Sequence, residues 1–143
     1  HRGRDWLLAH NGWVNYVDDH PRAEGETDSE QIFHQIMDKV VEYEEGGPIR
    51  GQYPALKQAI EHIIDTYGSN IRLNLLISDG NQLYAYNHYP GKPIYMLRRS
   101  KMYGDAILVS TQRLTNEDWR EIPADKLLAI NRGEILVLSD SVI

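Results

Sequence analysis

The protein has 143 residues, an acidic composition and no cysteine, which together exclude several classes of protein. This length suits one domain with a real hydrophobic core and is short for two. Lys and Arg total 15 against 21 Asp and Glu, a net charge of −6, so the chain repels phosphate backbones and no nucleic-acid partner is expected. No apolar run approaches the roughly 20 residues of a membrane span, so no membrane partner is expected. The lack of cysteine excludes disulfides and thiolate metal sites and favours a cytoplasmic protein.

The first third of the chain predicts two short strands followed by a helix. The apolar run at residues 6–9 leads through His10 into Asn11-Gly12, a pair typical of a hairpin turn, with residues 13–16 as the return strand. After a predicted loop, Thr27 and Glu30 have the spacing of a capping box, which predicts the start of a helix. Its apolar face is expected to contain Phe33, Ile36, Met37, Val40 and Val41, and Gly46-Gly47-Pro48 is expected to end it.

The rest of the chain predicts one more helix and then several strands. The helix runs from about Pro54 to Gly68, with an apolar face of Leu56, Ala59, Ile60, Ile63 and Ile64. Alternating residues at 70–78 predict a half-buried strand, and Asp79-Gly80 predicts a hairpin to a partner strand at 82–88. Further strands are expected at 94–99, 106–110, 127–130 and 135–138, the last two joined by a turn at 131–133. This order indicates an α+β fold with helices packed against a mainly antiparallel sheet.

Four segments along the chain carry a family resemblance. They are Trp6-Leu7-Leu8-Ala9-His10-Asn11-Gly12, residues 25–30 (Gly-Glu-Thr-Asp-Ser-Glu), residues 74–80 (Asn-Leu-Leu-Ile-Ser-Asp-Gly), and residues 107–110 with Asp118-Trp119 downstream. Together they resemble class II glutamine amidotransferases of the N-terminal-nucleophile hydrolase superfamily, and the stand-alone members more than the fused synthases. The resemblance implies a four-layer αββα sandwich. It also implies that residues 1–143 are a single domain, the C-terminal portion of the family's domain, incomplete at the N-terminus.

The resemblance further implies how such a site works. An N-terminal cysteine attacks the γ-amide of glutamine or of a γ-glutamyl compound, ammonia leaves, and water releases glutamate from the thioester. No metal or organic cofactor is implied, and an upstream arginine grips the substrate carboxylate. Because the chain has no cysteine and begins at His1 without a methionine, we expect the nucleophile outside it, and Arg2 and Arg4 are not assigned the arginine's role. The ammonia acceptor and a partner, whether a synthase or a second copy in a homo-oligomer, stay open.

Three residues match the family's site. Asn11 and Gly12 match the oxyanion hole, where an amide NH2 and a backbone N–H would face the developing negative charge. The alternative for this pair is the hairpin turn. Asp28 matches the acceptor for the α-ammonium of the substrate, and its alternative is a charge that stabilises the helix start. His10, beside these residues, is expected to orient the substrate site.

Other interpretations remain beside this one. The six histidines have neither the spacing nor the partners of a metal site, so no metal is expected. The absence of cysteine favours a non-enzymatic paralogue that uses the scaffold for binding or regulation. A third hypothesis is an enzyme with an N-terminal serine or threonine as its nucleophile.

Overall fold

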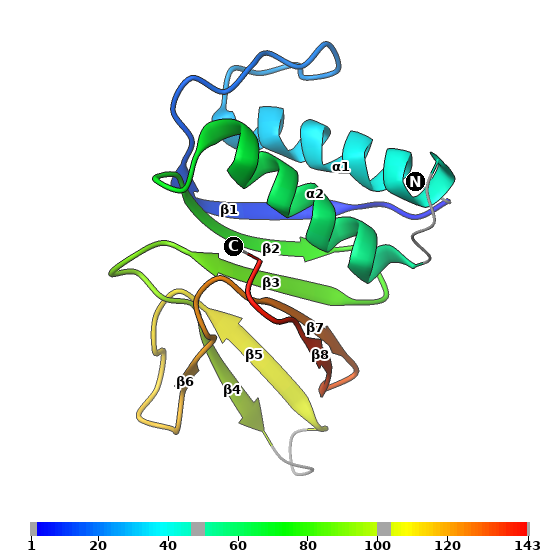
Figure 1. Ribbon diagram of the computed structural model, residues 1–143. Helices are drawn as coiled ribbons and strands as arrows, with labels where there is room; N and C mark the ends of the chain where they lie inside the picture. The colour runs from blue at the N-terminus through cyan, green and yellow to red at the C-terminus, as the bar shows by residue number, and fades with distance from the viewer. Residues whose placement is uncertain (1–2, 47–50, 100–103, 143) are drawn as a thin grey trace.

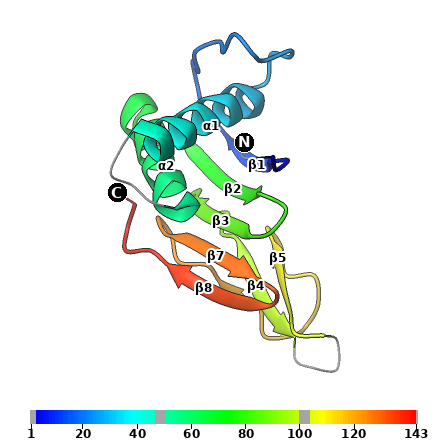
Figure 2. The same ribbon diagram turned by 90° about the vertical axis from the view of Figure 1, so that its right-hand side faces the viewer.

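A computed structural model describes residues 3–46, 51–99 and 104–142 of the protein. These residues form a layer of two helices, a five-stranded sheet A and a three-stranded sheet B (Figures 1 and 2). The helices are α1 (Asp28–Gly46) and α2 (Gln52–Tyr67). Sheet A has the order β1 (Leu7–Trp13), β2 (Arg72–Ser78), β3 (Leu83–His88), β7 (Leu127–Asn131) and β8 (Glu134–Leu138). Sheet B has the order β5 (Ala106–Ser110), β4 (Tyr95–Arg99) and β6 (Arg120–Glu121).

Sheet A lies in the middle, and its central strands β2 and β3 are largely buried on both faces. Alternate residues of β2, such as Leu73 and Leu75, pack with α1 and α2, whereas Leu76 packs into a second apolar cluster with sheet B. The two faces therefore build separate hydrophobic layers, as the two-residue period of a strand requires. The expectation of a half-buried strand at residues 70–78 is wrong in this respect, because sheet B covers the second face and buries even Asn74.

The predicted fold class is confirmed. All strand pairings among the described residues are antiparallel. Helices, sheet A and sheet B supply three of the four layers that the resemblance implies, and the described residues do not form a second helical layer. None of the helices in this part of the chain is both long and apolar enough to cross a membrane.

The start of α1 follows the predicted capping box only in part. The Thr27 hydroxyl accepts a hydrogen bond from the Glu30 amide at 3.3 Å, as predicted. The Glu30 carboxylate instead accepts from the amides of Glu24 and Gly25, at 2.7 and 2.9 Å, and so binds the preceding loop. The buried face of the helix consists of Gln31, Ile32, Ile36, Met37 and Val40, rotated slightly from the predicted face. Helix α1 is described as far as Gly46, and the Gly47 and Pro48 of the predicted stop lie outside the described residues.

Helix α2 and most of the later strands match their predictions. Gly68 ends α2, and its amide donates to the Ile64 carbonyl at 2.8 Å. The hairpin of β2 and β3 and the strands β4, β5, β7 and β8 lie within a residue or two of the predicted ranges. The two-residue strand β6 was not predicted, because Arg120 and Glu121 are polar, exposed and too few to produce an alternating pattern.

The predicted hairpin at Asn11-Gly12 is wrong. Strand β1 runs without interruption from Leu7 to Trp13, and Asn11 and Gly12 pair with Asn74 and Leu73 of β2. Of the predicted return strand, only Trp13 lies in a strand, and it continues β1. Asn-Gly favours a tight turn only when nothing better is available, and here pairing along the whole of β2 provides the alternative.

Candidate active site

Strand β1 places the candidate residues on two faces of sheet A. It is an edge strand of sheet A, and α1 lies above it (Figure 1). His10 and Gly12 pair with Leu75 and Leu73, which face the helices, so they share that face. Asn11 pairs with Asn74 and therefore lies on the opposite face, toward sheet B.

The Asn11 side chain lines a hollow of about 480 Å³ between β1 and sheet B. The other lining residues are Gly91, Lys92, Pro93, Tyr95, Thr111 and Gln112, and none of them is acidic. Among the described residues, no group hydrogen-bonds the side-chain amide of Asn11, which leaves its NH2 available to a ligand. The buried Asn74 fixes the Lys92 side of the hollow, because its Nδ2 donates to the Lys92 carbonyl at 2.7 Å.

Asp28 lies in the first turn of α1, on the helix face of the sheet. Its Oδ2 accepts a hydrogen bond from the backbone amide of Val14 at 2.8 Å, and its Oδ1 lies 3.3 Å from the Ser29 hydroxyl. The positive end of the helix dipole stabilises a carboxylate here. The carboxylate is thus held at Val14, two residues beyond Gly12 and just past the end of β1, although a loop separates Gly12 from Asp28 in the sequence.

His10 connects the sheet to the start of α1. Its Nδ1 lies 2.9 Å from the Ser29 hydroxyl, and its Nε2 donates to the carbonyl of Arg72 at 3.0 Å. Asp28, Ser29 and His10 therefore form one chain of contacts from the helix to β2.

Gly12 is required by the close approach of β2. A Cβ atom at this position would lie 1.8 Å from the Arg72 carbonyl oxygen and 2.9 Å from His10 Nε2, far inside van der Waals contact. Only glycine has no such atom. Arg72 itself lies with its guanidinium 3.7 Å from the centre of the Trp13 ring, a cation–π contact on the next pair of the ladder.

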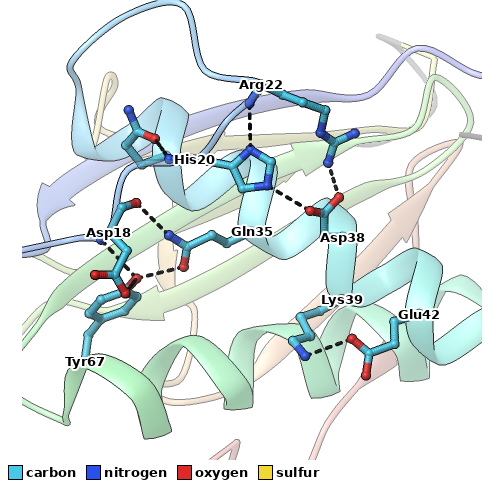
Figure 3. Close-up of polar contacts among 9 residues, drawn as sticks. Asp18, His20, Arg22, Gln35, Asp38, Lys39, Glu42 and Tyr67 are labelled. Atoms are coloured by element: carbon cyan, nitrogen blue, oxygen red, sulfur yellow. Dashed lines mark hydrogen bonds and ion pairs between the residues drawn. The ribbon is translucent and has the colours of Figure 1, made fainter.

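The loop between β1 and α1 is held on the helices by two sets of polar contacts (Figure 3). Asp38 of α1 accepts from His20 Nε2 at 2.8 Å and forms an ion pair with Arg22. The Gln35 amide donates to the Asp18 carbonyl at 3.0 Å, and the Tyr67 hydroxyl of α2 donates to Gln35 Oε1 at 2.9 Å. This loop joins Gly12 to Asp28, so its attachment fixes the distance between them.

The candidate residues are thus brought together incompletely. His10, Gly12 and Asp28 lie around one point where β1, β2 and α1 meet, while Asn11 faces the hollow on the other side of the strand. A larger hollow of about 910 Å³, at the far end of sheet B near Met96, Asp118 and Arg132, contains none of the candidate residues. Within the described ranges, no three histidines or acids lie close enough together to hold a metal ion.

Sequence reasoning missed two participants. The family pattern gives Ser29 no role, although its position next to Asp28 at a helix start places it on the same turn. Arg72 participates through its backbone carbonyl, and no residue pattern marks a functional carbonyl.

Comparison with known proteins decides the family. The profile described as class-II glutamine amidotransferases matches residues 1–108, about three quarters of the chain. The chain belongs to the class II glutamine amidotransferase family. The match spans β1, both helices and the β2–β3 hairpin, and therefore includes His10, Asn11, Gly12 and Asp28.

Solved structures of three other proteins share the fold. A predicted glutamine amidotransferase from Pseudomonas aeruginosa is 26% identical, with a TM-score of 0.75, over 94% of this chain and 61% of that one. A class-II domain protein from Silicibacter pomeroyi is 24% identical, with a TM-score of 0.68, over 95% of this chain and 67% of that one. The glutamine phosphoribosylpyrophosphate amidotransferase of B. subtilis is 14% identical, with a TM-score of 0.67, over all of this chain and 30% of that one. Because the last two structures are less than 25% identical to this chain, their likeness shows a shared fold alone.

A curated relative is known from an archaeon. An uncharacterized protein of Methanocaldococcus jannaschii is 28% identical over 93% of this chain and 43% of its own length. The amidotransferase chain thus spans less than half of that relative and about three fifths of the Pseudomonas protein.

Proposed function

We propose that this chain is the substrate-binding and oxyanion-binding part of an enzyme that hydrolyses the γ-amide of glutamine or of a γ-glutamyl compound. Asn11 and Gly12 would stabilise the oxyanion, and Asp28 would bind the α-ammonium. One observation carries the proposal: the hydrogen bond from the Val14 amide to Asp28, which holds a carboxylate beside the strand that contains both donors. The α-ammonium of one glutamine would be bound at Asp28, and its γ-carbonyl would be reached across the edge strand β1, because the Asn11 side chain lies on the other face of that strand.

The surroundings of Asn11 support its role as a donor. The hollow that it lines contains a lysine, amides and hydroxyls but no carboxylate, so negative charge that develops there would not be repelled. The Asn11 NH2 has no acceptor within the described part of the chain. Such a preorganised donor stabilises an oxyanion without having to break an existing bond.

The chemistry requires one group from outside these 143 residues. A thiolate attacks the γ-carbonyl carbon, and the C–N bond breaks. The departing nitrogen takes a proton shuttled by the nucleophile's own α-amine and leaves as ammonia. Water then cleaves the thioester, which gives glutamate and restores the thiol. The present residues would bind the substrate and stabilise both oxyanions, and neither step uses a metal or an organic cofactor.

The wider assignment follows from the same proposal. We propose a cytoplasmic protein in which residues 1–143 form a single domain, the C-terminal portion of a class II domain. Its partner would be a synthase that consumes the ammonia or a second copy of the chain.

A second candidate rests on the composition. The 143 residues contain no cysteine, which also fits a non-enzymatic paralogue that binds a γ-glutamyl compound for regulation. The unbonded Asn11 amide and the anchored Asp28 argue for the enzyme, because a regulatory site has no need of an oxyanion donor.

The deciding experiment compares this chain with the longest protein that its gene encodes. Each is incubated with L-glutamine, and ammonia and glutamate are measured. We expect no turnover by the 143-residue chain and equal amounts of the two products from the longer protein, abolished by thiol alkylation. Turnover that resists alkylation would indicate a serine or threonine nucleophile. No turnover in either protein would support the non-enzymatic paralogue.

A further inference from the structure

The protonation of His10 is fixed on one side by a backbone group. Its Nε2 lies 3.0 Å from the Arg72 carbonyl oxygen, which can only accept a hydrogen bond, so Nε2 carries a proton. In the neutral ring the other nitrogen, Nδ1, is then an acceptor. The group that faces it at 2.9 Å is the hydroxyl of Ser29.

The Ser29 hydroxyl has two competing acceptors. Besides His10 Nδ1 at 2.9 Å, it lies 3.3 Å from Oδ1 of Asp28. A hydroxyl has one proton to donate, and the shorter contact is the stronger one. A neutral His10 therefore draws the proton away from Asp28.

The direction of the Ser29 hydroxyl decides whether one oxygen of Asp28 has a hydrogen-bond donor. Its Oδ2 is occupied by the Val14 amide at 2.8 Å. In the part of the chain that the structure describes, Ser29 is the only residue that hydrogen-bonds Oδ1. Once His10 takes the Ser29 proton, Oδ1 is left for a donor from outside the protein.

We propose that His10 and Ser29 are positioning residues that keep Oδ1 of Asp28 open for the α-ammonium of a γ-glutamyl substrate. The proposal rests on the proposed function of Asp28 and adds to it the two residues that decide whether Oδ1 of this carboxylate is open to the α-ammonium. His10 acts through Ser29, and neither residue needs to touch the substrate.

The proposal predicts that a substitution of Ser29 restores the substrate binding that a substitution of His10 weakens. Replacing His10 by phenylalanine keeps the ring volume but removes the acceptor, so the Ser29 hydroxyl turns to Asp28 and competes with the substrate. Removing that hydroxyl as well should restore binding. Two residues with a merely structural role would instead lose more affinity together than either does alone.

The experiment titrates the longest protein that the gene encodes with two probes and follows the backbone amides of Val14 and Ser29 by NMR. Any nucleophilic cysteine is replaced by alanine so that the substrate is not consumed, and this protein serves as the wild type of the comparison. The probes are L-glutamine and glutaramate, which has the same amide and carboxylate but no α-amine. For His10→Phe we expect L-glutamine affinity to fall roughly 3- to 10-fold, the size of one hydrogen bond, with glutaramate affinity unchanged. For His10→Phe combined with Ser29→Ala we expect L-glutamine affinity to return to within about twofold of the wild type.

Two results separate failure of the inference from failure of the proposed function. If the wild type prefers L-glutamine, Asp28→Asn removes the preference and the double substitution does not restore binding, the inference is overturned while the role of Asp28 stands. If the wild type has no preference for L-glutamine, or Asp28→Asn leaves it intact, the proposed function fails and the inference with it.

A measurement on the unmodified protein covers the case in which a variant does not fold. The ¹⁵N shifts of the His10 ring at pH 7.5 report which nitrogens carry protons. We expect a neutral ring with the proton on Nε2. A ring protonated on both nitrogens would donate to Ser29 and turn its hydroxyl toward Asp28, which would overturn the proposal.

Discussion

The backbone amide of Val14 donates a hydrogen bond to the carboxylate of Asp28 at 2.8 Å. The two residues are 14 positions apart in the sequence. Val14 lies just past the end of β1, and Asp28 lies at the start of α1. This bond fixes the start of α1 against the end of β1. A ligand that binds at the end of β1 therefore lies beside the carboxylate of Asp28.

In the protein that carries the nucleophile, Asp28→Asn should raise KM with kcat largely preserved. The contact with the α-ammonium is made equally in the ground state and the transition state, and uniform binding of this kind appears in KM. Loss of a charge-assisted hydrogen bond predicts an increase on the order of 10- to 100-fold. Steady-state kinetics with L-glutamine measure both constants.

A matched variant separates binding from the helix dipole. Glu30→Gln removes a charge from the same first turn of α1 and leaves one amide oxygen to accept from the loop amides of Glu24 or Gly25. It should cost roughly a few tenths to 1 kcal/mol for the lost charge, and somewhat more for the lost loop contact, without the change in KM. An amide that lacks the α-amine supplies the second control. Should Asp28→Asn impair that amide as much as L-glutamine, Asp28 has a structural role only.

Asn11→Ala should have the opposite kinetic effect. The lost NH2 acts mainly on the charge that develops in the transition state, so kcat should fall by roughly 10²–10³-fold with little change in substrate binding. Asn116→Ala, at an exposed loop position that does not line the hollow of Asn11, is the control and should leave kcat unaltered. An Asn11→Ala enzyme with the kcat of the wild type would exclude the oxyanion role.

The local signals in the sequence were sufficient for the second helix and the central hairpin. A five-residue apolar face followed by Gly68 predicted α2, and alternation followed by Asp79-Gly80 predicted β2 and β3. In each case the deciding interactions lie within a few residues of one another. Such elements can be predicted from one sequence because little in the rest of the fold competes with them.

Strand β1 could not be predicted in the same way. Asn11-Gly12 has the local pattern of a turn, and what makes it extended is pairing with residues 73 and 74, about sixty positions away. The site inherits this difficulty. Asp28 and His10 were found through a family pattern, whereas Ser29 joins them only through distances that the folded chain creates.

Gly12→Ala should destabilise the protein and disturb the site together. The new Cβ would lie 1.8 Å from the Arg72 carbonyl, and a backbone atom cannot move away without shifting the β1–β2 pairing. Overpacking of this kind costs roughly 1–3 kcal/mol. Urea unfolding followed by tryptophan fluorescence measures the loss. Gly46→Ala is the matched control, because a Cβ there meets nothing within 4 Å, and equal stability of the two variants would contradict the close approach.

The last prediction concerns the buried carboxylate of Asp79 at the β2–β3 turn. Burial alone raises the pKa of Asp79, but the hydrogen bonds from the amides of Gln82 and Asn81 and from the Arg4 guanidinium outweigh it, so the pKa lies below its ordinary value. A carboxyl whose pKa is lower in the folded state stabilises the fold above its unfolded pKa, and this contribution is lost as the pH falls. Because the ordinary pKa of Asp79 is 3.8, this stabilising contribution is expected to be lost below about pH 4.

Asp79→Asn should therefore destabilise the protein by roughly 1–3 kcal/mol at pH 7, the cost of removing a buried, charged hydrogen-bond partner. The difference from the wild type should narrow as the pH is lowered from 5 to about 3, because the carboxyl of Asp79 takes up a proton in the unfolded wild type at a higher pH than in the folded protein. Urea unfolding at several pH values measures it. Asp118→Asn is the control, since Asp118 and its partner Arg120 are 78% and 74% exposed and such pairs contribute little. A gap between wild type and Asp79→Asn that stays constant down to pH 3 would mean that the Asp79 contacts do not stabilise its charged form.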